Sequence, residues 1–269
     1  MFQDRIVGFF YLKIFLLIVL LLIIGSVVFK IIAEVHDSKF TTNTFSVLMV
    51  AADSKLVFVD KTTKRANFYA IGDIRKIVRG KDQLGASLAL GVPVDAMIID
   101  KKFPSNIAEL STSETQWRLI FDSQPFFKNM DRYDVYKFVS AVKDSIKDNR
   151  VEKRINLFDD KKRKELLKDQ FKDSVINNMS YTIEINNGTK INGLGGDLAY
   201  ILGQQGFNVI AVRSVNESAS SYVAFPGAKD MYIDTLINLT GFEFKHEQIS
   251  QTADVTIFLG DDLEAMLSP

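Results

Sequence analysis

The first part of the chain is apolar, without the polar positions that divide every later segment. Residues 14–29 (IFLLIVLLLIIGSVVF) carry no charge, and apolar residues continue upstream to Phe9, interrupted by Lys13. A helix of this length crosses a hydrocarbon core of about 30 Å at about 1.5 Å per residue. The pattern predicts a short tail over residues 1–13 and a transmembrane helix over residues 14–33.

A cleaved signal peptide is the alternative for this segment. The sequence VVFKIIAEVH after the apolar run contains no evident small-x-small cleavage site, which favours an uncleaved anchor. The tail carries Arg5 and Lys13, whereas the other flank mixes lysines with Glu34 and Asp37. By the positive-inside rule this favours a cytoplasmic N-terminus. No second apolar run of spanning length follows, so we expect the soluble domains to lie outside the plasma membrane.

The next segment alternates strand and helix patterns. Residues 45–71 read as three β-branched and apolar strands separated by short polar turns. A helix is predicted over residues 82–90, ended by glycine and proline, and a buried strand over residues 94–100. Residues 131–147 carry an apolar stripe at helical spacing. Together they predict an α/β domain over residues 45–149.

Charge dominates the stretch that follows. Residues 150–178 mix many lysines and arginines with nearly as many carboxylates, which predicts a charged helical linker with a thin apolar edge at Leu166, Leu167 and Phe171. A third class of function, a structural or assembly subunit that pairs through this helix, stays open.

Residues 179–269 then predict a compact βαββαβ domain, α/β or α+β. Its strands are expected at 181–186, 207–213, 221–225 and 255–259, and its helices at 194–205 and 229–240.

Composition narrows the chemistry. The chain has 269 residues, of which 47% are hydrophobic, and 33 basic residues balance 33 acidic ones. This is not the basic footprint of a nucleic-acid binder. The absence of cysteine excludes disulfides, thiolate metal sites and cysteine nucleophiles, and two histidines exclude a histidine-rich metal cage.

A glycine-rich segment between a predicted strand and helix is the most suggestive local motif. Residues 187–196 read NGTKINGLGG, and backbone N–H groups at such a helix start can hold an anion or an acidic sugar. The alternative is a structural turn that needs glycines for its geometry. The candidate ligand-binding residues are Asn187, Gly188, Gly193, Gly195 and Gly196. The acidic turn at Asp261, Asp262 and Glu264 is typical of a strand end, and we predict no metal there.

The C-terminal residues resemble the LytR C-terminal domain family. YTIEINNGTKINGLGG is similar to the motif that opens that domain, and ADVTIFLGDD to the one that closes it, with QQGFNVIAV and SSYVAFPG in order between them. The resemblance covers roughly residues 179–262. It implies a protein of the bacterial cell envelope.

The upstream half resembles, more faintly, the LytR–CpsA–Psr domain, whose members transfer glycopolymers from a polyprenyl-pyrophosphate carrier to the cell wall. Such chemistry needs arginines to clamp the pyrophosphate and acidic residues to hold Mg²⁺. Where the family has SIPRD, residues 70–74 read AIGDI, and the family's RxRH segment has no counterpart beyond Trp117-Arg118. The remaining candidates for phosphate chemistry are Asp53, Asp73, Arg75 and Arg79.

The missing arginines favour a degenerate, non-catalytic first domain, because losing a charge clamp on a phosphoryl group lowers the rate by orders of magnitude. The resemblance therefore implies a single-pass, outward-facing envelope protein without a cofactor. Its expected partners are the lipid bilayer, through residues 14–33, and cell-wall glycan or another envelope protein. The alternative is an active glycopolymer phosphotransferase that uses Mg²⁺.

Overall fold

The structure is a computed structural model, and it places most of the chain. The described residues are 2–36, 38–78, 81–100, 112–121, 126–146, 150–155, 163, 165, 167, 170–250 and 252–267. The chain divides into two compact units, Met1–Ser38 and Lys39–Pro269. Each unit is described by itself.

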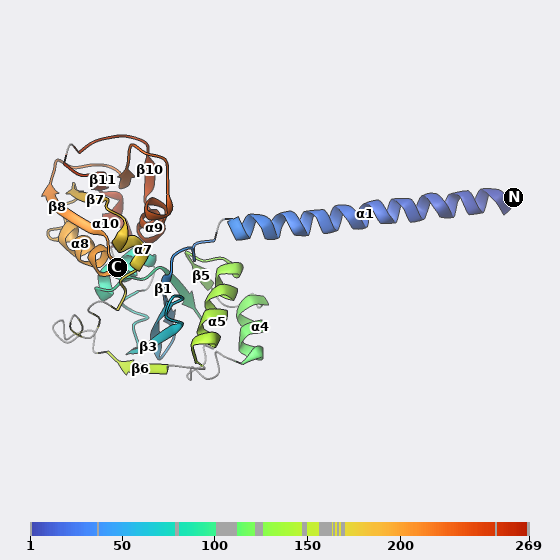
Figure 1. Cartoon of the computed structure of the whole chain (residues 1–269), viewed down its shortest axis with the longest axis horizontal. Coiled ribbons are helices and arrows are strands. Elements are labelled where there is room, and N and C mark those ends of the chain that lie inside the picture. The colour runs from blue at the N-terminus through green and yellow to red at the C-terminus, as the bar shows by residue number, and fades with distance from the viewer. Residues whose placement is uncertain are drawn as a thin grey trace. The chain divides into compact units, whose positions relative to one another are not determined.

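The N-terminal unit is one helix. Helix α1 runs continuously from Phe2 to His36, over 35 residues (Figure 1). None of its window Lys13–Lys30 is buried, and in the described part of the chain α1 is the one helix long and apolar enough to cross a membrane. A core helix of a soluble protein would bury such side chains. The predicted apolar helix is therefore confirmed as an element of structure.

The first sheet of the second unit has six strands in the order β5-β4-β1-β2-β3-β6. β1, β2 and β3 form the antiparallel meander that the turn-separated apolar runs predict, β4 pairs parallel with β1, and β6 pairs parallel with β3. The strands are β1 Thr44–Val50, β2 Ser54–Asp60, β3 Arg65–Gly72, β4 Ala96–Ile99, β5 Phe126–Lys128 and β6 Arg150–Arg154.

Both faces of this sheet are covered. Helices α4 (Ser113–Phe121) and α5 (Arg132–Ile146) pack on one face through buried residues such as Leu119 and Phe138. Helix α2 (Gln83–Leu90) lies against the other through Ala86 and Leu90. This arrangement suits the parallel pairs, whose strands are normally buried on both sides.

The predicted charged helical linker over residues 150–178 is wrong in its first part. Residues 150–154 form β6, the edge strand of the sheet, which among the described strands pairs only with β3. A charged segment can form such a strand because an edge strand exposes side chains to solvent, here Lys153 and Arg154. Leu167 and Phe171 are buried in the core of the first sheet, where the Phe171 ring meets Phe58 at 5.1 Å between centroids. Leu167 and Phe171 are therefore core rather than part of a solvated surface, and Leu166 lies outside the described residues.

The second sheet has five strands in the order β10-β9-β11-β7-β8 and confirms the predicted α/β class. It follows the predicted βαββαβ order, with β10 and the final helix as additions. The strands are β7 Thr182–Asn187, β8 Asn208–Ser214, β9 Tyr222–Ala224, β10 Glu243–Lys245 and β11 Val255–Leu259. The helices are α7 Ser174–Asn178, α8 Leu194–Gln205, α9 Met231–Thr240 and α10 Asp262–Leu267.

Local chemistry explains where the main helices of this region begin and end. The Asp230 carboxylate accepts a hydrogen bond from the N–H of Ile233 at the start of α9. Gly206 and Gly241 end α8 and α9 in the left-handed conformation, at φ 100° and 74°. Such C-terminal glycines are what the sequence predicts at these positions.

The two sheets share one compact unit. Leu84 of α2 is buried in the core of the second sheet, although α2 belongs to the first region of the chain. The Asn129 amide donates to the Asp95 carbonyl at 2.7 Å and to the Asn238 carbonyl at 2.8 Å. The Gln205 amide donates to the Asp95 carboxylate at 2.9 Å. The predicted boundaries of the two domains stay a prediction.

Candidate functional site

The candidate phosphate residues lie at one edge of the first sheet. β1, β3, β4 and β6 run in the same direction, so their carboxyl ends meet at that edge, where ligands of α/β sheets commonly bind. Asp53 is exposed on the turn between β1 and β2, and Asp73 follows β3, whose last residue Gly72 pairs with Ser54. Arg79 lies outside the described residues. The topology thus brings Asp53 and Asp73 to the same edge.

Asp73 and Arg75 neutralise each other. The Arg75 guanidinium donates to both Asp73 oxygens, at 2.8 Å and 2.5 Å, and its backbone N–H donates at 3.1 Å. These hydrogen bonds lower the pKa of the Asp73 carboxyl to about 2. Both side chains are about half exposed. The pair is a local surface contact in which the guanidinium already holds a carboxylate.

A second ion pair at this edge was not predicted. Asp100 directly follows β4 and is buried, and its carboxylate lies 2.9 Å from the guanidinium of Arg118 on α4. The sequence offered Asp100 only as the end of a buried strand, and no local spacing connects it to Arg118. Arg75 and Arg118 therefore each face a protein carboxylate, whereas Arg154, the last residue of β6, is exposed.

The glycine-rich loop between β7 and α8 is closed by its own hydrogen bonds. The Asn187 side-chain oxygen accepts from the Thr189 N–H at 3.1 Å and from the Thr189 hydroxyl at 2.7 Å. Its amide nitrogen donates to the Ile191 carbonyl at 3.1 Å, and the Lys190 N–H donates to Glu264 at 2.9 Å. The side-chain oxygen and the side-chain nitrogen of Asn187 thus both form hydrogen bonds within the turn.

The glycines of this loop have different reasons to be glycine. A Cβ on Gly188 would lie 2.9 Å from the Asn216 carbonyl, and one on Gly195 would lie 2.8 Å from Val212. Gly193 caps α8 at φ 84° without a side-chain hydrogen bond. Gly196 is exposed, and a Cβ there would meet nothing within 4 Å. Packing and backbone geometry account for three of the four; the binding role of the loop stays a prediction.

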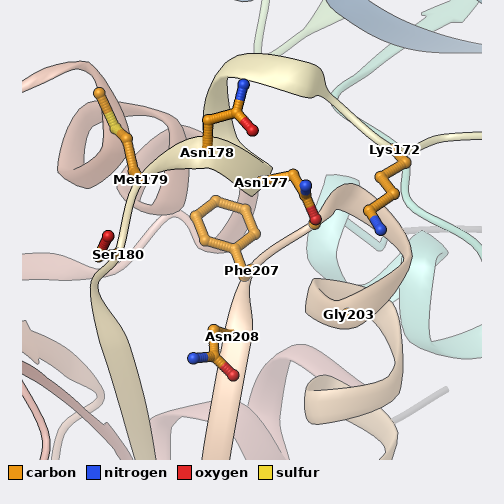
Figure 2. Close-up of a pocket in the computed structure, with 9 residues that line it drawn as sticks. Lys172, Asn177, Asn178, Met179, Ser180, Gly203, Phe207 and Asn208 are labelled. Carbon is orange, nitrogen blue, oxygen red and sulfur yellow. The ribbon is translucent and has the colours of Figure 1, made fainter.

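A pocket of about 520 Å³ lies where the α7–β7 connection passes the end of α8. Figure 2 shows the Phe207 ring at its centre, with Asn177 and Lys172 on one side and Asn208 below. We call it the α7–α8 pocket. Its lining residues are Lys172, Asn177, Asn178, Met179, Ser180, Gly203, Gly206, Phe207 and Asn208.

The lining is polar, and the described residues that form it include no carboxylate. Three carboxamides, one hydroxyl and one ammonium group are exposed there, and none of them hydrogen-bonds to a residue that the structure describes. The Phe207 ring, which lines the pocket, is itself buried and packs against Tyr232, with ring centroids 4.8 Å apart. The Asp173 N–H donates to the Gln205 carbonyl at 3.0 Å, which ties the start of α7 to the end of α8. Sequence reasoning missed this pocket.

Metal ligands do not gather in the part of the chain that is described. Across those residues, no three side chains of His, Cys, Asp or Glu lie close enough together to hold a metal ion.

Comparison with known proteins bears on the C-terminal region. Residues 180–263 match the LytR_C family, described as LytR cell envelope-related transcriptional attenuator. This region of the chain therefore matches a LytR C-terminal domain, as the sequence predicts.

Two other comparisons add little. The X-ray structure of the Lin1025 protein from Listeria innocua is similar at a TM-score of 0.31 and 11% sequence identity, over 43% of this chain and 84% of that one. This similarity is too low to support a conclusion. No curated protein matches the sequence.

Proposed function

We propose that this protein is a single-pass, membrane-anchored protein of the bacterial cell envelope that binds or scaffolds at the cell wall without catalysing a reaction. Its partner is wall glycan or another envelope protein, and it uses no cofactor. The observation that carries the proposal is the LytR C-terminal domain at residues 180–263, in a chain whose first helix is apolar and has no buried residue in its window Lys13–Lys30. An apolar helix that the protein does not bury suits a lipid environment.

The non-catalytic reading is supported by the charges at the edge of the first sheet. Arg75 and Arg118 are each held by a carboxylate, Asp73 and Asp100 respectively. A pyrophosphate clamp would have to break these contacts before the guanidinium groups could bind phosphate oxygens. Binding is therefore favoured over transfer chemistry.

Sedimentation with cell-wall sacculi tests the binding role. Residues 39–269 form a compact unit apart from the first helix, so this unit can be used alone. We expect it to sediment with sacculi and to be displaced by soluble glycan released from them. A unit that stays in the supernatant at all protein concentrations would contradict wall-glycan binding and favour a protein partner.

Membrane fractionation tests the anchor. The full chain should fractionate with membranes and resist extraction with high salt, whereas a chain without residues 1–38 should not. Protease added to spheroplasts should digest the folded unit if it lies outside. Release of a shortened, soluble protein would indicate a cleaved signal peptide instead.

One observation favours the phosphotransferase alternative. Carboxyl ends of parallel strands collect Asp53, Asp73 and Asp100 at one edge. A transfer assay with a polyprenyl-pyrophosphate glycan donor and Mg²⁺ examines this directly. Turnover that is lost in Asp100→Asn would establish the enzyme and overturn the non-catalytic proposal.

A further inference from the structure

We propose that the α7–α8 pocket is the saccharide-binding subsite of this protein, and that it accepts a neutral or anionic sugar chain. This inference rests on the proposed function and names the place where wall glycan binds. The pocket volume of about 520 Å³ falls within the range of about 300–1,000 Å³ that is usual for small-ligand sites.

The chemistry of the lining selects the ligand. Each carboxamide of Asn177, Asn178 and Asn208 offers one acceptor oxygen and two N–H donors, and these side chains have no partner among the described residues. Sugar hydroxyls both donate and accept, so adjacent hydroxyls of one ring can use such groups in pairs. Apolar ligands would leave them unsatisfied.

The positive charge of Lys172 also favours a sugar ligand, in particular an anionic one. Among the described residues of the lining, Lys172 is the one with an ionisable side chain, and it is exposed. Its ammonium group attracts anionic substituents and repels cationic ones. A sugar chain with phosphate or carboxylate groups should therefore bind more tightly than its neutral counterpart.

Gly203 gives an independent sign. It occupies an exposed position within α8, where glycine is less favourable than alanine, yet a Cβ there would meet nothing within 4 Å. Nothing in the described chain requires glycine at this position. The position lines the pocket, so a missing side chain leaves room for a ligand to approach the helix backbone. Gly206, by contrast, is needed at φ 100° and close to Asn177.

Variants of the 39–269 unit separate these roles. Asn208→Ala should weaken sedimentation with sacculi by about 2- to 10-fold, as expected for a lost polar contact. Asn216→Ala is the matched control, an exposed asparagine on the β8–β9 connection outside the pocket.

Gly203→Ala should raise the melting temperature by about 2–4 °C and still weaken binding. A more stable protein with weaker binding cannot be explained by damage to the fold.

Two sacculus preparations identify the sugar chemistry. Lys172→Gln should weaken binding to sacculi that keep their anionic polymers and leave binding to stripped sacculi nearly unchanged. If the wild-type unit binds neither preparation, the wall-glycan form of the proposed function fails, the pocket assignment fails with it, and a protein partner is favoured. If it binds, but Asn208→Ala and Gly203→Ala bind equally well, only the pocket assignment is overturned. Loss of binding in Gly196→Ala together with retention in Gly203→Ala would move the site to the glycine-rich loop.

Discussion

The two sheets of the folded unit use their polar side chains differently. At the carboxyl edge of the first sheet, Asp73 holds Arg75 and Asp100 holds Arg118. In the α7–α8 pocket beside the second sheet, the exposed carboxamides have no partner among the described residues. Paired charges are already engaged within the protein, whereas exposed polar groups without such a partner are available to a ligand. The comparison favours the C-terminal region as the place of the proposed binding.

The largest predicted effect tests whether the two regions are structurally independent. Leu84 of α2 is buried in the core of the second sheet. Leu84→Ala should lower the free energy of unfolding of residues 39–269 by about 2–4 kcal/mol, because a large apolar side chain leaves a cavity. Denaturant unfolding should show one transition that moves to lower concentration. Two transitions, of which only one moves, would show that the sheets unfold separately.

The next effect concerns the contact between β1 and α7. The buried Asp173 carboxylate accepts hydrogen bonds from the N–H and hydroxyl of Thr44, at 2.9 Å and 3.1 Å, and from the N–H groups of Val175 and Ile176. Asp173→Ala should lower the free energy of unfolding by about 3 kcal/mol, since buried donors lose a charged partner. Thr44→Val, which removes one of these donors, should have a smaller effect in the same denaturation measurement. If both variants lowered the free energy of unfolding equally, the claim that the Asp173 carboxylate stabilises several buried donors at once would be contradicted.

A pH-dependent effect is expected where the regions meet. Burial raises the pKa of the Asp95 carboxyl, against the hydrogen bonds from Ser46 and Gln205. A carboxyl whose pKa is raised on folding keeps its proton longer in the folded state, so stability falls as the pH rises from its ordinary pKa near 3.8 to the raised value. The wild type should lose stability relative to Asp95→Asn over that range, by at most about 1.4 kcal/mol per pH unit. A constant difference from pH 4 to pH 7 would refute the raised pKa.

The smallest effect belongs to the exposed ion pair of the first sheet. Because Arg75 lowers the pKa of Asp73 to about 2, the stabilising contribution of the pair is complete above pH 3.8 and is lost as the pH falls toward 2. NMR titration should place the Asp73 midpoint near 2, and Arg75→Gln should return it toward 3.8. The thermal stability of Arg75→Gln at pH 7 should barely change, since exposed pairs contribute little. A large loss would mean that the pair does more than neutralise two surface charges.

Local sequence patterns predicted much of the fold. The apolar stripe over residues 131–147 became α5, and glycines marked the ends of α8 and α9, because helical periodicity and capping depend on neighbouring residues. Strand β6 was missed, since charged edge strands carry no apolar alternation and depend on a partner strand distant in sequence.

The site was harder to predict for the same reason. The α7–α8 pocket combines Lys172, Asn177 and Asn208, which approach only after α7 is held against the end of α8. The Asp100–Arg118 pair likewise joins residues from separate elements. Glycine-rich loops attract attention in a sequence, but Gly188 and Gly195 are explained by close packing. Sequence identifies unusual segments, whereas convergence of ordinary polar residues requires the tertiary structure.

Binding of the 39–269 unit to two ligands in parallel tests the central claim most directly. One is wall glycan and the other is a polyprenyl-pyrophosphate lipid in vesicles, each measured with and without Mg²⁺. The account predicts Mg²⁺-independent binding to glycan and no binding to the lipid. Mg²⁺-dependent binding to the lipid that is lost in Asp53→Ala or Arg75→Ala would contradict it and establish the first sheet as an active phosphate site.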